Sequence, residues 1–183
     1  KQIRFDKPIY IGMTVLDLSK LLMYETYYNK INKLWPNNEL IGFDTDSFFL
    51  NIYTEDVYQD MQLSCETEGH MQNKNWFDTS GYPKDHPLYS EENKKVIGKF
   101  KDELNGEVMD EIVFLKSKCY SFKTTKKTLI KKCKGISKTV VNKDMELKDY
   151  KKTLFKQNID YKSMHVINNI NHSMYTIKVN KKA

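Results

Sequence analysis

Two short apolar runs, separated by only three residues, constrain the fold of this chain more than any other feature. The first run spans Glu39 to Phe43 and the second spans Ser47 to Tyr53, and both are rich in Ile, Leu and Phe. Asp44, Thr45 and Asp46 lie between them. This spacing is typical of a β-hairpin, so the pattern predicts two strands with carboxylates at the tip that joins them.

A helix is expected before this hairpin. Lys7 to Ile11 has the pattern of a short strand, and Thr14 is the predicted N-cap of a helix over about Val15 to Ile31. Apolar residues recur there at the three-to-four spacing of a helix packed against a sheet, namely Val15, Leu18, Leu21, Leu22, Tyr28 and Ile31. The segment from Asn32 to Asn38 contains Pro36 and ends the helix.

An acidic region follows the predicted hairpin. Thr54 to Met61 has the pattern of a short helix capped by Thr54. Ser64 to Asn93 has the Gly, Pro, Asn and Asp content of a long irregular connection, and loops of this length in compact domains are usually functional or disordered. From Thr54 to Asn93 there are nine acids against Lys74 and Lys84.

The remaining chain predicts mostly strands. Lys95 to Lys101 and Glu107 to Lys123 have strand character around Asn105-Gly106, a dipeptide that favours a hairpin turn. Leu147 to Phe155 is a predicted helix. The residues of that helix expected to point inward are Leu147, Tyr150, Leu154 and Phe155. His165 to Val179 is a predicted closing hairpin around Asn168 to His172.

Nine lysines and no acid lie between Lys116 and Lys138, in what is predicted to be a further hairpin. This block carries a charge of +9 and the rest of the chain −3, so the positive net charge of +6 comes from the block, which would give a polyanion one docking stripe. Three widely spaced cysteines, Cys65, Cys119 and Cys133, argue against a disulfide framework and favour an intracellular, reducing location. We expect no membrane span, and we expect the chain to begin within a longer protein.

Asp44 and Asp46 are the sharpest candidates for chemistry. Two carboxylates two residues apart at a tight turn can point toward one place, and Mg²⁺ prefers clustered oxygen ligands. Such a metal can stabilise charge on a phosphoryl group during an in-line displacement. Aspartates are also common as ordinary turn residues, so the tripeptide alone leaves both interpretations open.

Three motifs in order resemble family B DNA polymerases. Asp44-Thr45-Asp46-Ser47 between two apolar strands resembles the D-T-D-S core of the third polymerase signature of that family. The segment around Lys7-Pro8-Ile9-Tyr10 and the following helix is similar to the region before this hairpin in protein-primed viral, organellar-plasmid and Polinton-type polymerases. Lys116 to Ser121 resembles their K-x-Y motif, and Lys132 to Ile136 resembles the segment after it.

The resemblance implies an α+β fold: an antiparallel palm-type sheet with a packed helix, followed by a small thumb subdomain. Residues 1–123 would belong to the palm, with a long insertion at about 62–93, and residues 124–183 to the thumb. The implied activity is DNA-directed DNA synthesis, in which a primer 3′-hydroxyl attacks a deoxynucleoside triphosphate. The implied partners are primer–template DNA and deoxynucleoside triphosphates and, for a protein-primed member, a terminal priming protein.

The resemblance also assigns roles. Asp46 would be the principal ligand of two catalytic Mg²⁺ ions and Asp44 a weaker one, while Thr45 and Ser47 would shape the turn. Lys118 and Tyr120 would hold the primer end, since lysine is a point-charge partner for phosphate. The lysines expected to contact the DNA backbone without reading sequence include Lys116, Lys123, Lys132 and Lys134.

The sequence departs from the family in two ways. Gly42 stands where the family usually has Tyr, two residues before the first Asp, which adds backbone freedom beside the carboxylates. The first polymerase signature, which supplies another metal-binding Asp, and the second, which holds the nucleotide, would both lie upstream of Lys1. We therefore expect this chain to bind DNA but not to polymerise alone.

Other interpretations remain open. The chain could be a non-catalytic, basic DNA-binding remnant of a transposon or viral polymerase. A D-x-D after an apolar strand also occurs in haloacid-dehalogenase-like phosphatases, although there a loop and a helix should follow, and Ser47 to Tyr53 continues as a strand.

A zinc site on Cys65, His70 and His86 lacks a fourth ligand. The aromatic residues of the acidic connection fit base stacking or, more commonly, packing onto the core, and they are Trp76, Phe77, Tyr82 and Tyr89.

Overall fold

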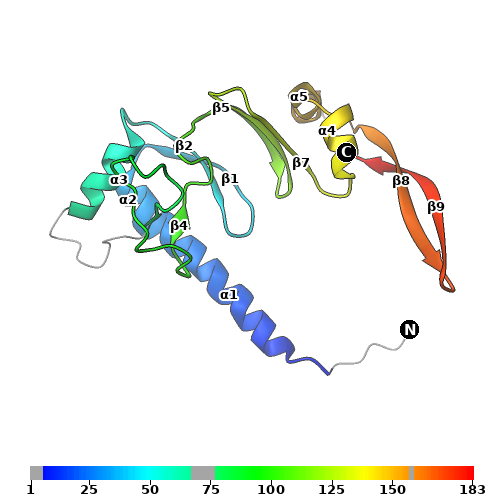
Figure 1. Cartoon of the computed structure of the whole chain (residues 1–183), viewed down its shortest axis with the longest axis horizontal. Helices are drawn as coiled ribbons and strands as arrows, with labels where there is room; N and C mark the ends of the chain where they lie inside the picture. Colours follow the sequence, from blue (N-terminus) through cyan, green and yellow to red (C-terminus); the bar gives the residue numbers. More distant parts are fainter. Residues whose placement is uncertain (1–5, 67–76, 157–158) are drawn as a thin grey trace. The chain divides into compact units, whose positions relative to one another are not determined.

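A computed structural model describes residues 6–66, 77–156 and 159–183 (Figure 1). The chain forms two compact units, residues 1–106 and residues 107–183, and each is described by itself. Helices and small, mainly antiparallel sheets occur in both units, which confirms the predicted α+β class. The predicted palm and thumb boundary after residue 123 falls within a strand of the second unit. Among the helices of the described residues, none is long and apolar enough to cross a membrane.

The first unit begins with a long helix. Helix α1 spans Ile9–Thr26 and continues through the π-helical turn η1, Tyr27–Ile31, into α2, Asn32–Leu34. The predicted strand over residues 7–11 is therefore wrong, because α1 begins directly after Pro8, whose missing N–H group costs nothing at a helix start. Thr14 is not the N-cap. It lies inside α1, where its hydroxyl donates to the carbonyl oxygen of Tyr10 at 2.9 Å.

Most of the predicted apolar face of this helix is exposed. Val15 and Leu18 are each 60% exposed, and Leu21 and Tyr28 are also more than half exposed, whereas Ile31 is 4% exposed. The expected packing of the whole helix against a sheet is thus wrong. Burial begins only at its end, where Ile31, Trp35 and Met61 form the core of the first unit.

The predicted first hairpin is confirmed. Strands β1, Asn38–Phe43, and β2, Phe48–Ile52, pair antiparallel, with Phe43 opposite Phe48 at the last pair before the tip. The register shifts between Leu40 and Gly42, so Ile41 forms a β-bulge. The bulge lies three residues before the first carboxylate of the tip.

Helix α3, Val57–Glu66, follows the hairpin, and its cap differs from the prediction. The N–H groups of Tyr58 and Gln59 donate to Oδ1 of Asp56, at 2.9 and 3.1 Å. Thr54 instead donates its hydroxyl to Oδ2 of Asp60 at 2.6 Å. Asp56 is therefore the capping residue, because it directly precedes the first helical residue.

The connection after α3 is irregular in its described part, as predicted. It contains two short strands, β3, Phe77–Asp78, and β4, Phe100–Lys101, which pair parallel to each other. The predicted hairpin around Asn105-Gly106 is wrong because β4 pairs with β3. The dipeptide does form a turn, with φ of 50° and 87°, in which Gly106 donates its N–H to Asp102 Oδ2 at 2.7 Å.

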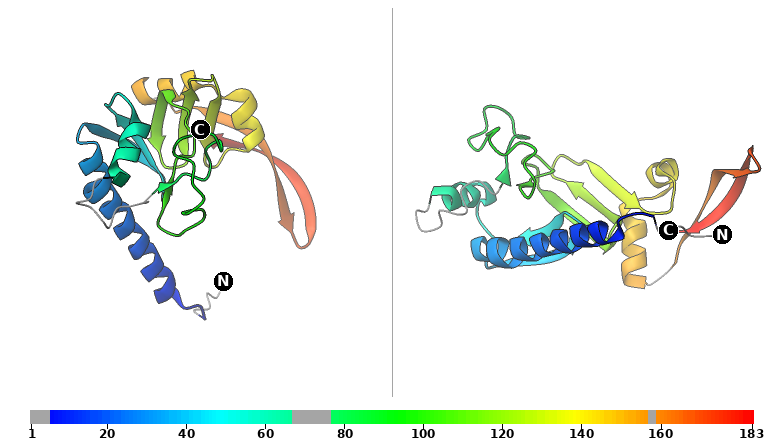
Figure 2. Two further views of the ribbon diagram at one scale, coloured as in Figure 1. Left: turned by 60° about the vertical axis from the view of Figure 1, so that its left-hand side comes forward. Right: turned by 90° about the horizontal axis from the view of Figure 1, so that it is seen from below.

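The second unit contains a three-stranded antiparallel sheet in the order β5–β6–β7 (Figure 2). The strands span Met109–Lys116, Cys119–Thr124 and Leu129–Cys133, so the predicted hairpin in the lysine-rich block is confirmed. Helices α4, Lys138–Asp144, and α5, Leu147–Lys156, pack against this sheet. The core of the second unit lies between these two helices and the sheet.

Helix α5 matches its predicted span, but only part of its predicted inner face is buried. Tyr150 is 1% exposed, whereas Leu154 and Phe155 are 48% and 78% exposed. The predicted closing hairpin is confirmed and is longer than expected, with β8 spanning Tyr161–Ile170 and β9 spanning Ser173–Lys182.

Candidate metal centre and nucleic-acid interface

The tip of the β1–β2 hairpin is a tight turn held by backbone hydrogen bonds. The N–H of Asp44 donates to the carbonyl oxygen of Ser47 at 3.0 Å, and the N–H of Asp46 donates to the carbonyl oxygen of Asp44 at 2.7 Å. The Ser47 hydroxyl donates to that same Asp44 oxygen at 3.3 Å. Thr45, between the two aspartates, has a φ of 64°, in the left-handed region that a reversal this tight requires.

This turn places Asp44 and Asp46 on either side of Thr45 in one loop. Asp44 is partly buried, whereas Asp46 is exposed. Both supply the oxygen ligands that Mg²⁺ prefers, so the donor chemistry at the tip fits the metal. The number of ligands is low: within residues 6–66, 77–156 and 159–183, no three acidic, histidine or cysteine side chains gather as a metal site.

The predicted primer-holding residues lie at one end of the sheet in the second unit. Ser117 and Lys118 form the two-residue turn between β5 and β6, and Lys118 has a φ of 62°. The carbonyl oxygen of Lys118 accepts a hydrogen bond from the N–H of Lys134 at 2.8 Å. Lys118 and Lys134 are therefore adjacent across β6 and β7. Lys116, which pairs with Cys119, lies at the same end of the sheet.

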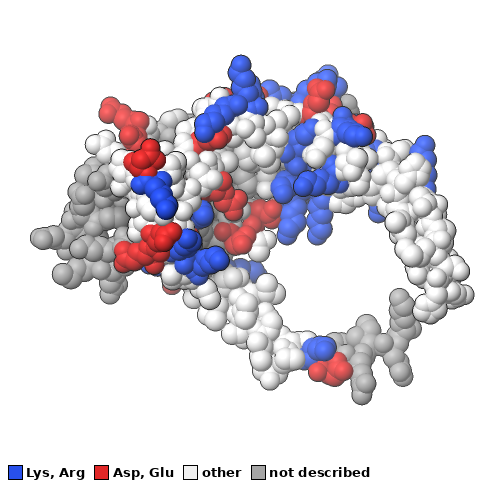
Figure 3. Space-filling model, in the orientation of Figure 1, with Lys and Arg blue, Asp and Glu red and all other residues white. Residues whose placement is uncertain are grey.

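Tyr120 is held in a row of aromatic rings on one face of this sheet. Its ring is nearly parallel to that of Phe114, at 5.6 Å between centroids and 9°, and to that of Phe122, at 6.3 Å and 15°. Lys132, which is exposed, is the direct partner of Tyr120 on β7. Figure 3 shows lysine side chains gathered around β7 in the second unit. An ordered aromatic row beside exposed ammonium groups suits a polyanion that also has planar bases.

Lys131 and Lys126, both in the lysine-rich block, have structural partners that the sequence does not reveal. Lys131 Nζ donates to the carbonyl oxygens of Asn142 and Met145, at 2.8 and 2.7 Å, and so binds the C-terminal end of α4. Lys126 forms an ion pair with Glu107 at 3.0 Å. Side chains alternate along β7, so Lys131 points to the opposite face from Lys132.

The structure brings the site residues together in two separate groups. Asp44 and Asp46 share the hairpin tip of the first unit, and Lys118, Tyr120, Lys132 and Lys134 share one sheet end in the second. Lys123 pairs with Leu129 toward the opposite end of β6, away from that group.

The zinc and base-stacking alternatives find no support in the described residues. The side chain of Cys65 and all of His70 and Trp76 lie outside the described part of the chain, and His86 Nδ1 accepts a hydrogen bond from the N–H of Leu88 at 3.1 Å. Tyr82 is 5% exposed, and its ring packs against that of His86 at 4.4 Å between centroids with a tilt of 43°, which confirms packing for this aromatic side chain.

Sequence reasoning missed a polar cluster in the first unit. The hydroxyls of Tyr58 and Tyr82 both donate to Oδ2 of Asp102, at 3.2 and 3.5 Å. Burial, with the Asp102 charge as the second cause, raises the pKa of both phenols well above the usual range. The cluster ties α3 to the irregular connection. No sequence signal links these residues, because 44 positions separate Tyr58 from Asp102.

Comparisons with known proteins give no match: no family model, no curated protein and no solved structure is similar to this chain.

Proposed function

We propose that this chain is the C-terminal palm and thumb portion of a family B DNA polymerase of the protein-primed type. Its reaction is the transfer of a nucleotide from a deoxynucleoside triphosphate to a primer 3′-hydroxyl. The observation that carries the proposal is the hairpin tip, where a two-residue spacing and a left-handed Thr45 put Asp44 and Asp46 in one four-residue loop.

In this proposal Asp46 is the principal metal ligand because it is the more exposed of the two carboxylates, and Asp44 is the secondary ligand. When bound, two Mg²⁺ ions supply charge stabilisation at the transferred phosphoryl group and favour ionisation of the primer hydroxyl. A further acid is required, and the resemblance to the family assigns it to a segment upstream of Lys1. The chain alone therefore binds DNA without extending it.

Lys118 and Tyr120 hold the primer strand in this proposal. Lys118 lies in a two-residue turn and is an exposed residue, as a contact to a backbone phosphate requires. The ring of Tyr120 is stacked with Phe114 and Phe122, which fixes its position beside Lys132 on the sheet. Lys132 and Lys134 add phosphate contacts that do not depend on sequence.

One observation favours a second candidate, a basic DNA-binding module without catalysis. The described residues contain a complete lysine and aromatic surface in the second unit, but in the first unit they supply only two carboxylates to the proposed metal centre. A protein that had lost its chemistry would keep the first feature without needing the second.

The test is to map where the 3′ end of a primer lies on the chain. A photoreactive nucleotide is placed at the primer terminus of a primer–template duplex, and in a matched control it is placed ten base pairs inside the duplex. The proposal predicts that the terminal probe cross-links to residues 117–120 and that the internal probe does not. Equal cross-linking by both probes would favour the non-catalytic module, and no cross-linking would contradict DNA binding itself.

A further inference from the structure

Cys119 and Cys133 face each other across β6 and β7. They are direct register partners, and their Sγ atoms lie 4.0 Å apart. The hydrogen bond from the Lys134 N–H to the Lys118 carbonyl oxygen, at 2.8 Å, marks the cysteines as a non-hydrogen-bonded pair. Side chains approach most closely at such pairs, and the Cα separation typical of them lies within the range that a disulfide accepts.

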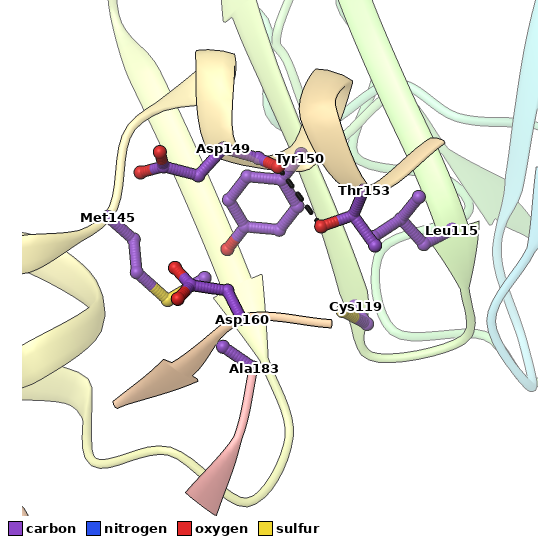
Figure 4. A pocket seen from close by; sticks show the side chains of 8 residues that line it. All are labelled: Leu115, Cys119, Met145, Asp149, Tyr150, Thr153, Asp160 and Ala183. Atoms are coloured by element: carbon purple, nitrogen blue, oxygen red, sulfur yellow. Dashed lines mark hydrogen bonds between the residues drawn. The ribbon is translucent and has the colours of Figure 1, made fainter. Parts of the chain in front are cut away.

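The two thiols belong to the core of the second unit. Cys119 and Cys133 are 5% and 7% exposed, and they pack with Val113, Met145 and Tyr150. Cys119 also lines a small pocket whose other walls include Tyr150 and Asp160 (Figure 4).

Burial raises the pKa of Cys133 to about 11, and the neighbouring Cys119 is the second cause. Cys133 therefore remains a thiol at neutral pH, so its attack on an oxidised Cys119 is slow and depends on the 4.0 Å contact between the two sulfurs.

We propose that Cys119 and Cys133 form a reversible disulfide site, oxidised by a peroxide and reduced by a dithiol. The Cys119 sulfur attacks one oxygen of hydrogen peroxide, the O–O bond breaks, and a sulfenic acid and one water form. The Cys133 sulfur then attacks the sulfenic sulfur, the S–O bond breaks, and a second water leaves. Two thiols lose two electrons, two protons leave with the oxygens, and the peroxide is reduced to water.

This site is placed to act on the lysine and aromatic surface. Cys119 lies between Lys118 and Tyr120 in sequence, and Cys133 lies between Lys132 and Lys134. Closing the disulfide brings the two sulfurs to about 2.05 Å and fixes β6 against β7. The effect on DNA rests on the proposed function, whereas disulfide formation does not.

The experiment uses the full 183-residue chain with Cys65→Ser, so that Cys119 and Cys133 are the only thiols. The folded protein is treated with hydrogen peroxide, alkylated in denaturant, digested and analysed by mass spectrometry. The expected product is a Cys119–Cys133 linked peptide, lighter by two hydrogens and reversed by dithiothreitol. Two alkylated cysteines, or two separately oxidised ones, would overturn the proposal.

Two further readouts separate the consequences. Oxidation should raise Tm by at least about 5 °C, because the link closes a loop of about 15 residues and lowers the entropy of the unfolded chain, and a Cys133→Ala control should show no rise. An unchanged Tm with the link formed would overturn the claim that it restrains the hairpin.

Duplex Kd should change by about fivefold on oxidation. Unchanged DNA binding with the link formed would overturn the coupling, and absence of binding in both states would contradict the proposed function and not the disulfide.

Discussion

Tyr120 and Lys132 are direct partners across β6 and β7, so a stacked aromatic ring and an exposed ammonium group lie side by side on the sheet. Lys131, one residue earlier, points to the other face and binds the end of α4. Two consecutive lysines thus have different roles: Lys132 belongs to the exposed surface, and Lys131 holds the end of α4 against the sheet. Exchanging them for alanine should have different effects.

Lys132→Ala should weaken binding to duplex DNA and lower the slope of log Kd against log salt by about 0.9, because one phosphate contact is lost. Lys131→Ala is the matched control. It should lower Tm, because two carbonyl oxygens of the helix end lose their donor, and it should leave the salt slope unchanged. Fluorescence anisotropy over a salt series measures the slope, and equal slopes in both variants would contradict the assignment.

Asp46→Asn should weaken binding of Mn²⁺, used as a probe for Mg²⁺, on the order of tenfold, because one carboxylate charge is removed at contact distance. Asp85→Asn, at an exposed position of the irregular connection, should leave Mn²⁺ affinity unchanged. Paramagnetic broadening of the NMR signals of residues 44–47 measures both. Unchanged broadening in the Asp46→Asn variant would show that the tip is an ordinary turn.

Tyr150→Phe should lower stability at pH 7 by about 1 kcal/mol, because the hydroxyl of Tyr150 donates to the carbonyl oxygen of Lys132 at 3.1 Å. Burial raises the pKa of Tyr150 well above its usual range, so the unfolded chain ionises first as the pH rises. This contribution is complete below pH ~10 and is lost above it. The difference between variant and wild type should therefore narrow above pH ~10 in urea unfolding, and a constant difference would contradict the burial of the phenol.

Ile31→Ala should cost about 2 to 4 kcal/mol of unfolding free energy, because Ile31 is 4% exposed in the core of the first unit. Leu18→Ala, at a position that is 60% exposed, should change stability by no more than about 0.5 kcal/mol. Urea unfolding followed by tryptophan fluorescence compares the two, since Trp35 lies in the same core. Similar losses would show that α1 is packed along its length in solution.

Local patterns predicted the elements whose partners lie nearby in sequence. The β1–β2 and β8–β9 hairpins and helix α5 follow from alternation, periodicity and turn residues within about 20 positions. The two aspartates at the first tip were located for the same reason. They share one loop because only residues 44–47 separate β1 from β2.

The errors arose where a local signal does not determine the partner. The three apolar residues after Pro8, Ile9 to Ile11, fit a strand or a helix equally well, because so short a run has no period. Asn105-Gly106 predicts a chain reversal but not which strands it joins, and β4 found its partner in β3. The roles of Lys131 and Asp102 depend on groups that are distant in the chain, and no pattern in one sequence reveals them.

The most direct test of the central claim is primer extension by the full-length natural protein that contains these residues, with Mg²⁺ and all four deoxynucleoside triphosphates. The account predicts extension by the wild type and by Asp85→Asn, and a rate lower by on the order of a thousandfold in Asp46→Asn. Extension at the wild-type rate by Asp46→Asn, or no extension by any variant including the wild type, would contradict it.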